Sequence, residues 1–477
     1  MSKEKLIARS REIERLKRCL KETDAQLVIL YGRRRIGKTY LITEFFDGRF
    51  DFKITGAYQE KREVQLRNFA EELSAHLKTR VDTPSDWTSA FRMLRSYLSA
   101  LPEDEKHIVF FDELPWLDTM HSGFLSAFEH FWNDYGCTVH NLVFIVCGSA
   151  ASWMTKNIAQ NKGGLFNRQT CSIYLQPFTL GETEEYLLSR DISWSRYDIA
   201  ECYMAVGGIP YYLSLLTPDR SLSDNIDNLF FRKRAELWNE FSQLYRTLFS
   251  NSDRYIRIAE ALSAKRIGLT RAEIAAKAGV PENGDLTEML KNLINSDFVR
   301  AYSFFGKKKG ETLYQLSDYY SWFYFKFIKD YHGRDEHFWS HSYSSPAKRA
   351  WAGFTFEQLC KDHIAQIKQK LGISGVLAEE SSWFVKGSEN QDGAQIDLLI
   401  DRNDHVINLC EIKFSSDEFT IDKDYDRVLR NKVAAFIDIT KTKKTIQTTM
   451  ITVFGVKDNK YSNYINTQVR LDDLFAQ

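Results

Sequence analysis

An eight-residue stretch that contains two glycines constrains this chain more than any other feature. The stretch GRRRIGKT fits the pattern GxxxxGK[ST] at every fixed position. The apolar run LVILY precedes it and the helical pattern TYLITEFF overlaps its end, so a strand, a loop and a helix follow one another. Glycines let such a loop curl until its backbone N–H groups point at phosphate oxygens. We therefore expect ATP to bind at Gly32, Arg33, Arg34, Arg35, Ile36, Gly37, Lys38, Thr39 and Tyr40.

Two further apolar runs end in polar residues that suit the same chemistry. HIVFFDE ends in Asp112 and Glu113, and LVFIVCGS ends in Ser149. We expect Lys38 to bridge the β- and γ-phosphates, and Thr39 and Asp112 to hold Mg²⁺. Glu113 would then polarise the attacking water, and Ser149 is a candidate sensor of the γ-phosphate. The alternative is a strand end with two solvated acids.

Composition limits the class of protein. The 477 residues suggest about three domains. Lysine plus arginine equals aspartate plus glutamate, at 64 each, so a nucleic-acid site has to be a local patch. The seven cysteines are scattered, as expected for buried thiols in the cytoplasm. We see no run of about 18 apolar residues and no signal peptide, so we expect no membrane partner.

The pattern of apolar and polar residues changes along the chain and divides it into segments. Residues 1–180 alternate apolar strands with helical stretches, which predicts an α/β domain with a parallel sheet. Residues 181–246 are expected to form helices, and 247–332 a winged helix, capped at Thr270, with a connecting helix. A last α/β domain is expected over 347–477, beginning with one long helix, KRAWAGFTFEQLCKDHIAQIKQKL.

The winged helix could read DNA or act as a lid. Its second candidate helix, GVPENGDLTEMLKNLINSDF, carries four acids against one lysine, so phosphate repulsion makes it a poor reader of the major groove. The hairpin tip, Lys307-Lys308-Lys309, could touch a DNA backbone but reads no bases. We therefore favour a lid.

The order GRRRIGKT, IVFFDELPW and FIVCGSA resembles the AAA+/STAND class of P-loop ATPases. It is most similar to the prokaryotic ATPases that carry a C-terminal nuclease-like domain. The resemblance implies that the box beginning at Arg9 lies near the adenine and that Pro210, in GGIP, packs near the base. It makes Arg168, in LFNR, a candidate arginine finger, and a finger acting in trans would require a homo-oligomer.

Each of these residues has a plainer alternative. Arg168 could be a surface arginine, and Pro210 could simply break a helix. Arg33, Arg34 and Arg35 occupy the variable positions of the loop. Their side chains are expected to point away from the phosphates, toward a lid, a neighbouring subunit or solvent.

The stretch GAQIDLLIDRNDHVINLCEIKF (393–414) predicts a hairpin of two apolar strands. A three-residue loop at 403–405 pairs Asp397 with Glu411, whereas a two-residue turn would put them on opposite faces. Facing carboxylates repel, so we expect a divalent metal between them with Lys413 alongside. The same register predicts an apolar face made of Ile396, Leu398, Ile400, Cys410, Ile412 and Phe414.

The set of Asp397 followed by Glu411-Ile412-Lys413 resembles the PD-(D/E)xK nuclease core. The resemblance implies that the two acids hold Mg²⁺ and that Lys413 orients water or stabilises the developing negative charge. Gln395 is a candidate assistant. Glu357 is either a further active-site acid or an ordinary surface glutamate.

Two functions are therefore carried forward. In the first, an AAA+/STAND-like ATPase with a helical lid and winged helix regulates a restriction-endonuclease-like α/β domain that cuts DNA with Mg²⁺. In the second, the ATPase is a molecular switch or scaffold whose nuclease-like domain binds nucleic acid or a protein partner without cleavage.

Overall fold

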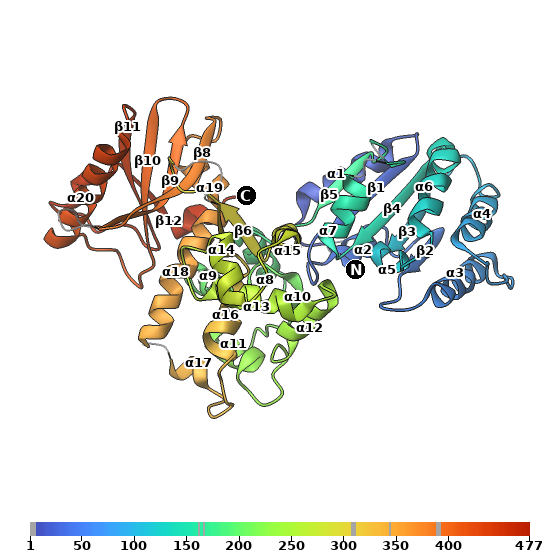
Figure 1. Ribbon diagram of the computed structural model, residues 1–477, viewed down its shortest axis with the longest axis horizontal. Helices are drawn as coiled ribbons and strands as arrows, with labels where there is room; N and C mark the ends of the chain where they lie inside the picture. The colour runs from blue at the N-terminus through green and yellow to red at the C-terminus, as the bar shows by residue number, and fades with distance from the viewer. Residues whose placement is uncertain (1–5, 161–162, 166, 307–311, 343–344, 388–392) are drawn as a thin grey trace. The chain divides into compact units, whose positions relative to one another are not determined.

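A computed structural model of the protein describes residues 6–160, 163–165, 167–306, 312–342, 345–387 and 393–477. The chain divides into two compact units, Met1–Pro177 and Phe178–Gln477 (Figure 1), and each is described by itself. Among the described residues no helix is both long enough and apolar enough to cross a membrane. The finer division at 180, 246 and 332 stays a prediction.

The first unit is built on a parallel five-stranded sheet in the order β2-β3-β4-β1-β5. Its strands are β1 (Gln26–Tyr31), β2 (Phe52–Thr55), β3 (His107–Asp112), β4 (Leu142–Gly148) and β5 (Cys171–Tyr174). Its helices are α1 (Ser10–Lys21), α2 (Lys38–Phe45), α3 (Arg62–Leu77), α4 (Trp87–Leu98), α5 (Leu114–Leu117), α6 (Phe124–Asp134), the short η1 (Gly136–Thr138), α7 (Ala151–Met154) and the π-helical η2 (Thr155–Ala159).

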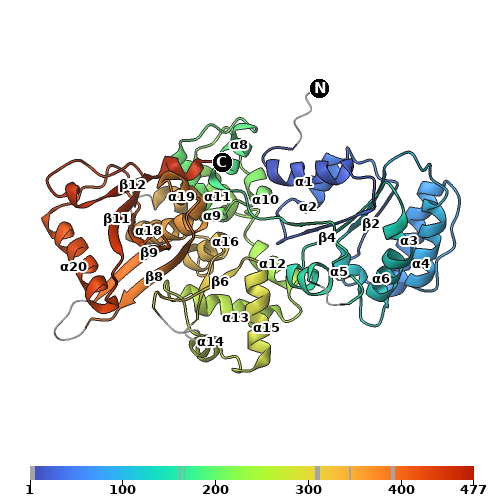
Figure 2. The same ribbon diagram turned by 90° about the horizontal axis from the view of Figure 1, so that it is seen from above.

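Helices cover both faces of this sheet, which explains its continuous apolar strands (Figure 2). Because side chains alternate along a strand, Leu27 and Ile29 of β1 pack into one core with α3, α4 and α6. Val28 and Leu30 pack into the opposite core with α1 and α2. The parallel sheet predicted over residues 1–180 is therefore present.

The second unit begins with helices. These are α8 (Leu180–Leu188), α9 (Arg196–Val206), α10 (Pro210–Ser214), α11 (Leu222–Phe230) and α12 (Glu240–Leu248). A segment of three helices and a hairpin follows, with α13 (Ser252–Ser263), α14 (Arg271–Ala278), α15 (Gly284–Asn295), β6 (Val299–Tyr302) and β7 (Leu313–Leu316). As expected, Thr270 caps α14, and it does so in a reciprocal capping box with Glu273. The lysines 307–309 of the hairpin tip lie outside the described residues.

The expected connecting helix is present, whereas the long helix that follows it is divided in two. The connecting helix is α16 (Tyr319–Phe323), which continues as the π-helical η3 (Tyr324–Ile328), and α17 (Phe338–His341) follows. The long helix expected at the start of the last domain is two helices, α18 (Pro346–Asp362) and α19 (Ile364–Lys370). The prediction of one helix was wrong because His363 leaves the helical conformation, and its Nε2 accepts a hydrogen bond from the Leu180 N–H at 2.9 Å.

The C-terminal sheet has the order β12-β11-β10-β9-β8. The first three strands along the chain pair antiparallel, and the last three pair parallel, with α20 as the crossover between β10 and β11. The elements are β8 (Ala378–Val385), β9 (Ala394–Arg402), β10 (Val406–Lys413), α20 (Lys423–Thr440), β11 (Thr445–Thr452), η4 (Ser462–Tyr464), β12 (Thr467–Arg470) and η5 (Leu471–Phe475).

The hairpin of β9 and β10 has the register expected from the three-residue loop. Four pairs are formed, from Ile407 opposite Asp401 to Cys410 opposite Leu398. The expected apolar face was wrong at Ile396, which packs instead with Leu399 and the α20 residue Phe436. The register between β8 and β9 shifts by one residue beside Asp397, and such a bulge turns the strand's side chains to the other face.

Candidate functional site

The phosphate loop between β1 and α2 has two positions at which the backbone favours glycine. Gly32 has a φ of 154°, and a Cβ there would lie 2.4 Å from the Leu175 carbonyl oxygen. Gly37 has a φ of 88° and open space around it, and Arg35 also has a positive φ, of 72°. The loop is therefore held in a tight curl with room beside Gly37, as a phosphate cradle requires.

Lys38 and Thr39 begin helix α2 at the end of this loop. The Lys38 ammonium is buried and donates to the carbonyl oxygens of Gly32 at 3.1 Å and Arg33 at 2.8 Å. The Thr39 hydroxyl donates to the Asp112 carboxylate at 2.8 Å. A hydroxyl and a carboxylate in contact are the oxygen donors that Mg²⁺ prefers, so these residues fit a magnesium ion.

The Glu113 carboxylate meets the end of the neighbouring strand β4. Glu113 has a φ of 47°, and its Oε2 accepts from the Ser149 N–H at 3.0 Å and from the Ser149 hydroxyl at 2.8 Å. The carboxyl ends of β1, β4 and β3 are adjacent because these strands are neighbours in the sheet. The structure thus brings Lys38, Thr39, Asp112, Glu113 and Ser149 to one edge of the sheet.

The other residues predicted for the nucleotide site differ in their burial and contacts. Arg9 donates to the carbonyl oxygens of Gln176 and Ile36, so it ties the phosphate loop to the segment before the first helix of the next unit. Arg33 is only 2% exposed, which makes the solvent-facing alternative wrong for this arginine, whereas Arg34 and Arg35 are half-buried. Tyr40 and Arg168 are exposed, and Pro210 is the first residue of α10 in the second unit.

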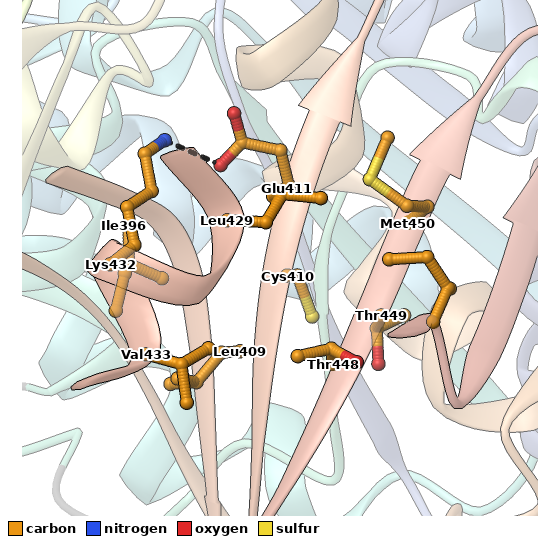
Figure 3. A pocket seen from close by; sticks show the side chains of 11 residues that line it. Ile396, Leu409, Cys410, Glu411, Leu429, Lys432, Val433, Thr448, Thr449 and Met450 are labelled. Carbon is orange, nitrogen blue, oxygen red and sulfur yellow. Dashed lines mark hydrogen bonds and ion pairs between the residues drawn. The ribbon is translucent and has the colours of Figure 1, made fainter. Parts of the chain in front are cut away.

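In the C-terminal sheet, Glu411 of β10 is buried beneath two lysines. Its Oε2 accepts from the Lys432 ammonium at 2.7 Å (Figure 3), and its Oε1 accepts from the Tyr425 hydroxyl at 2.7 Å. The Lys413 ammonium lies 3.0 Å from Oε1. Burial alone would raise the pKa of Glu411, but Lys413 and Lys432 outweigh it and lower that pKa.

Asp397 lies where β9 and β10 separate. Its Oδ2 accepts from the Ile412 N–H at 3.3 Å, and its Oδ1 accepts from the Gln395 amide at 3.4 Å. Burial, and then the nearby Glu411 carboxylate, raise the pKa of Asp397. The Asp397 carboxylate therefore accepts the Ile412 N–H in place of a backbone carbonyl, just beyond the last of the four β9–β10 residue pairs.

Glu357 of α18 lies close enough to the same group to interact with Asp397, Lys413 and Glu411. Burial, and then repulsion from Asp397, raise its pKa to about 7. Glu357 is half-buried beside these charged groups, which does not fit the alternative of an ordinary surface glutamate.

These acids do not present a ready magnesium site. The described residues hold no group of three or more histidines, cysteines or acids that could bind a metal. Both oxygens of Glu411 already accept hydrogen bonds, and the cavity beneath it is about 20 Å³, room for little more than one water. The positive charge that we expected from a metal is supplied here by Lys413 and Lys432.

Sequence reasoning missed the α20 residues that contact Glu411. Tyr425 and Lys432 are seven residues apart, which is two helical turns, so they share one face of α20. That spacing was the available signal, but nothing in the sequence shows which strand the face covers.

Comparisons with known proteins agree with a nucleotide-binding site in the first unit. Residues 6–216 match the family described as an ATPase domain predominantly from Archaea. An uncharacterised protein of Methanocaldococcus jannaschii is 24% identical over 431 residues, covering 89% of this chain and 90% of that protein. An uncharacterised ATP-binding protein of the same archaeon is 49% identical over 43 residues, which are 9% of this chain and 73% of that protein.

A solved structure shares the fold. The Walker-type ATPase of Pyrococcus abyssi superposes with a TM-score of 0.50 at 18% identity, covering 68% of this chain and 96% of that one. This likeness concerns the fold, whereas the family match and the phosphate-loop geometry concern the site. The family match and the phosphate-loop geometry together support a P-loop ATPase.

Proposed function

We propose that the protein is an AAA+/STAND-like ATPase whose hydrolysis of ATP, with Mg²⁺, regulates a nuclease-like C-terminal domain that acts on DNA. The observation that carries the ATPase part is the pair of contacts at one sheet edge, Thr39 with Asp112 and Glu113 with Ser149. Magnesium, when bound, neutralises charge on the phosphates. Thr39 and Asp112 would hold it, and Lys38 would exchange its loop carbonyls for phosphate oxygens.

Glu113 would orient the attacking water. Its carboxylate is held by the Ser149 N–H and hydroxyl, so a change at the γ-phosphate that moves Ser149 also moves the base. Arg168, exposed in the first unit, is the candidate finger, from the same chain or from a neighbouring copy. Pro210 and the helices around it are the candidate lid, together with the three-helix and hairpin segment.

The ATPase part is tested by phosphate release and nucleotide binding. Lys38→Ala is expected to abolish ATP binding, and Glu113→Gln is expected to retain binding while losing turnover. If the finger acts in cis, Arg168→Ala should lower turnover at every protein concentration. If it acts in trans, the substitution should lower turnover only at protein concentrations high enough for copies of the chain to associate. Unchanged nucleotide affinity in Lys38→Ala would refute the phosphate-loop assignment.

For the C-terminal domain, the acids Asp397 and Glu411 with Lys413 support an action on phosphodiesters, and Glu357 and Gln395 are candidate helpers. A second function is favoured by one specific contact. The Lys432 ammonium donates a hydrogen bond to Glu411 Oε2, an oxygen that a catalytic metal would need. This contact suits a domain that binds nucleic acid or a protein without cutting. Cleavage with Mg²⁺ would require Lys432 to release this oxygen.

Incubation with DNA, Mg²⁺ and ATP separates the two functions. Cleavage that disappears in Lys413→Ala supports the first. Binding without cleavage, unchanged in Lys413→Ala, supports the second. Cleavage that survives the substitution would rule out the assigned site.

A further inference from the structure

A separate pocket of about 430 Å³ lies within the second unit, between the three-helix and hairpin segment and the C-terminal sheet. Its volume is in the range of small-ligand sites. We call it the α18 pocket and define it by six of its lining residues, Arg266, Tyr302, Phe304, Glu357, Lys361 and Gln395.

Two cations at this pocket each lie over an aromatic ring. The Arg266 guanidinium is exposed and lies 5.6 Å from the Phe354 ring centroid. The Lys361 ammonium lies 5.9 Å from the Tyr302 ring centroid. Neither forms an ion pair with the described residues. The two cations are therefore available to an anionic ligand.

The charges around Lys361 also favour an anion. Burial lowers the pKa of Lys361, and Arg300 lowers it further, against the opposing pull of Glu357, Asp397 and Asp362. Because Arg300 is already paired with Asp362 at 2.8 Å, that acid is shared between two cations. Burial and Arg300 thus oppose the charge on Lys361, and a phosphate beside the ammonium would favour it.

The wall of the pocket is aromatic and fixed in place. The Tyr302 hydroxyl donates to the Ile267 carbonyl oxygen, and the backbone of Phe304 pairs with Ser382 of β8. The two rings lie nearly perpendicular, with centroids 5.9 Å apart. Fixed aromatic faces beside cations are the combination on which unpaired bases stack while their phosphates are neutralised.

The pocket also borders the acidic group described above. Gln395 and Glu357 line it, and the Gln395 amide donates to Asp397. The pocket is therefore linked to Asp397 through the Gln395 amide.

We propose that the α18 pocket binds one unpaired nucleotide of single-stranded DNA, with Arg266 and Lys361 on the phosphate and Tyr302 and Phe304 against the base. This rests on the proposed action of the C-terminal domain on DNA, and it names the form of DNA. A paired base cannot reach these rings without leaving its stack, which disfavours an intact duplex.

Fluorescence anisotropy of the full chain with a labelled oligothymidylate of about 12 nucleotides tests the proposal. Arg266→Ala should weaken binding and make the slope of log affinity against log salt shallower by about 0.7, the value for one single-strand phosphate contact. Phe304→Leu keeps the backbone pairing with Ser382 and should weaken binding about tenfold through lost stacking. Arg349→Ala, at an exposed arginine of the same helix α18, is the matched control and should bind as wild type.

An abasic strand of equal charge and a duplex complete the experiment. The proposal expects Phe304→Leu to leave affinity for the abasic strand unchanged, because no base remains to stack. Wild-type affinity in both Arg266→Ala and Phe304→Leu, or binding of the duplex alone, would overturn the pocket and leave the action on DNA intact. A wild-type chain that binds neither form would overturn the pocket and the proposed action on DNA together.

Discussion

Replacing Lys432 by glutamine should loosen strand β10 by a predictable amount. Glu411 is 8% exposed and has three partners, Lys432 at 2.7 Å, Tyr425 at 2.7 Å and Lys413 at 3.0 Å. A hydrogen bond to a charged group contributes about 1.5–3 kcal/mol. Removing every partner from a buried charge would cost about 3–5 kcal/mol, but Lys413 and Tyr425 stay in Lys432→Gln. We therefore expect β10 to lose about 2 kcal/mol of local stability.

Hydrogen exchange measured by mass spectrometry reports this locally, which suits a chain of two units. A loss of about 2 kcal/mol corresponds to exchange about 30-fold faster in β10 peptides. The matched control is Arg427→Gln on the same helix α20, whose pair with Asp424 at 3.1 Å is exposed and should contribute under about 0.5 kcal/mol. Equal exchange in β10 for both variants would refute the reasoning.

The effect should also depend on pH with a definite sign. The folded state lowers the pKa of Glu411, so its contribution is present above the unfolded pKa and is lost as the pH falls through the folded pKa. The difference between wild type and Lys432→Gln should therefore be largest at neutral pH and shrink in acid. A difference that grows on acidification would contradict the assignment of the charge pair.

Three further predictions concern separate parts of the chain. Ser149→Ala should lower steady-state phosphate release about tenfold without changing nucleotide affinity, because its carboxylate partner keeps only the backbone donor; unchanged turnover would count against the contact. Gly208→Ala should lower the thermal midpoint of unfolding by the equivalent of about 3 kcal/mol, since the new Cβ would lie 2.0 Å from the Phe178 carbonyl oxygen. The control is Gly353→Ala, whose new Cβ would have no atom within 4 Å and should not destabilise the protein. Glu357→Gln should raise that midpoint at pH 8 and leave it unchanged at pH 3. A pKa raised from 4.5 to about 7 on folding costs stability that builds up as the pH rises above 4.5 and is complete above 7. Equal effects at both pH values would argue against the raised pKa.

The first unit was predictable because its signals are local. A glycine-bounded loop between an apolar run and a helical pattern has few structural solutions, and the parallel sheet that follows places Asp112 and Ser149 at the same edge. The β9–β10 register was predictable for a similar reason. A three-residue loop puts Asp397 and Glu411 on the same face of the hairpin, whereas a two-residue loop puts them on opposite faces.

What sequence reasoning missed depends on remote partners. The bulge beside Asp397 arises from pairing with β8, so the alternation of β9 alone cannot reveal it. The break at His363 depends on an N–H that is 183 residues earlier in the chain. Lys432 reaches Glu411 only because α20 docks on that face of the sheet.

The bond from the Leu180 N–H to His363 bears on how the chain is made. During synthesis the N–H emerges from the ribosome long before the imidazole, so the Leu180 N–H lacks this buried partner until the chain has been translated past residue 363. Gly181 likewise packs against the carbonyl of Phe475, at the far end of the chain. The first unit ends at Pro177 and has its own cores, so it can fold while the rest is being synthesised. The nascent chain would thus complete its phosphate loop first, and the unit with the acidic site would close last.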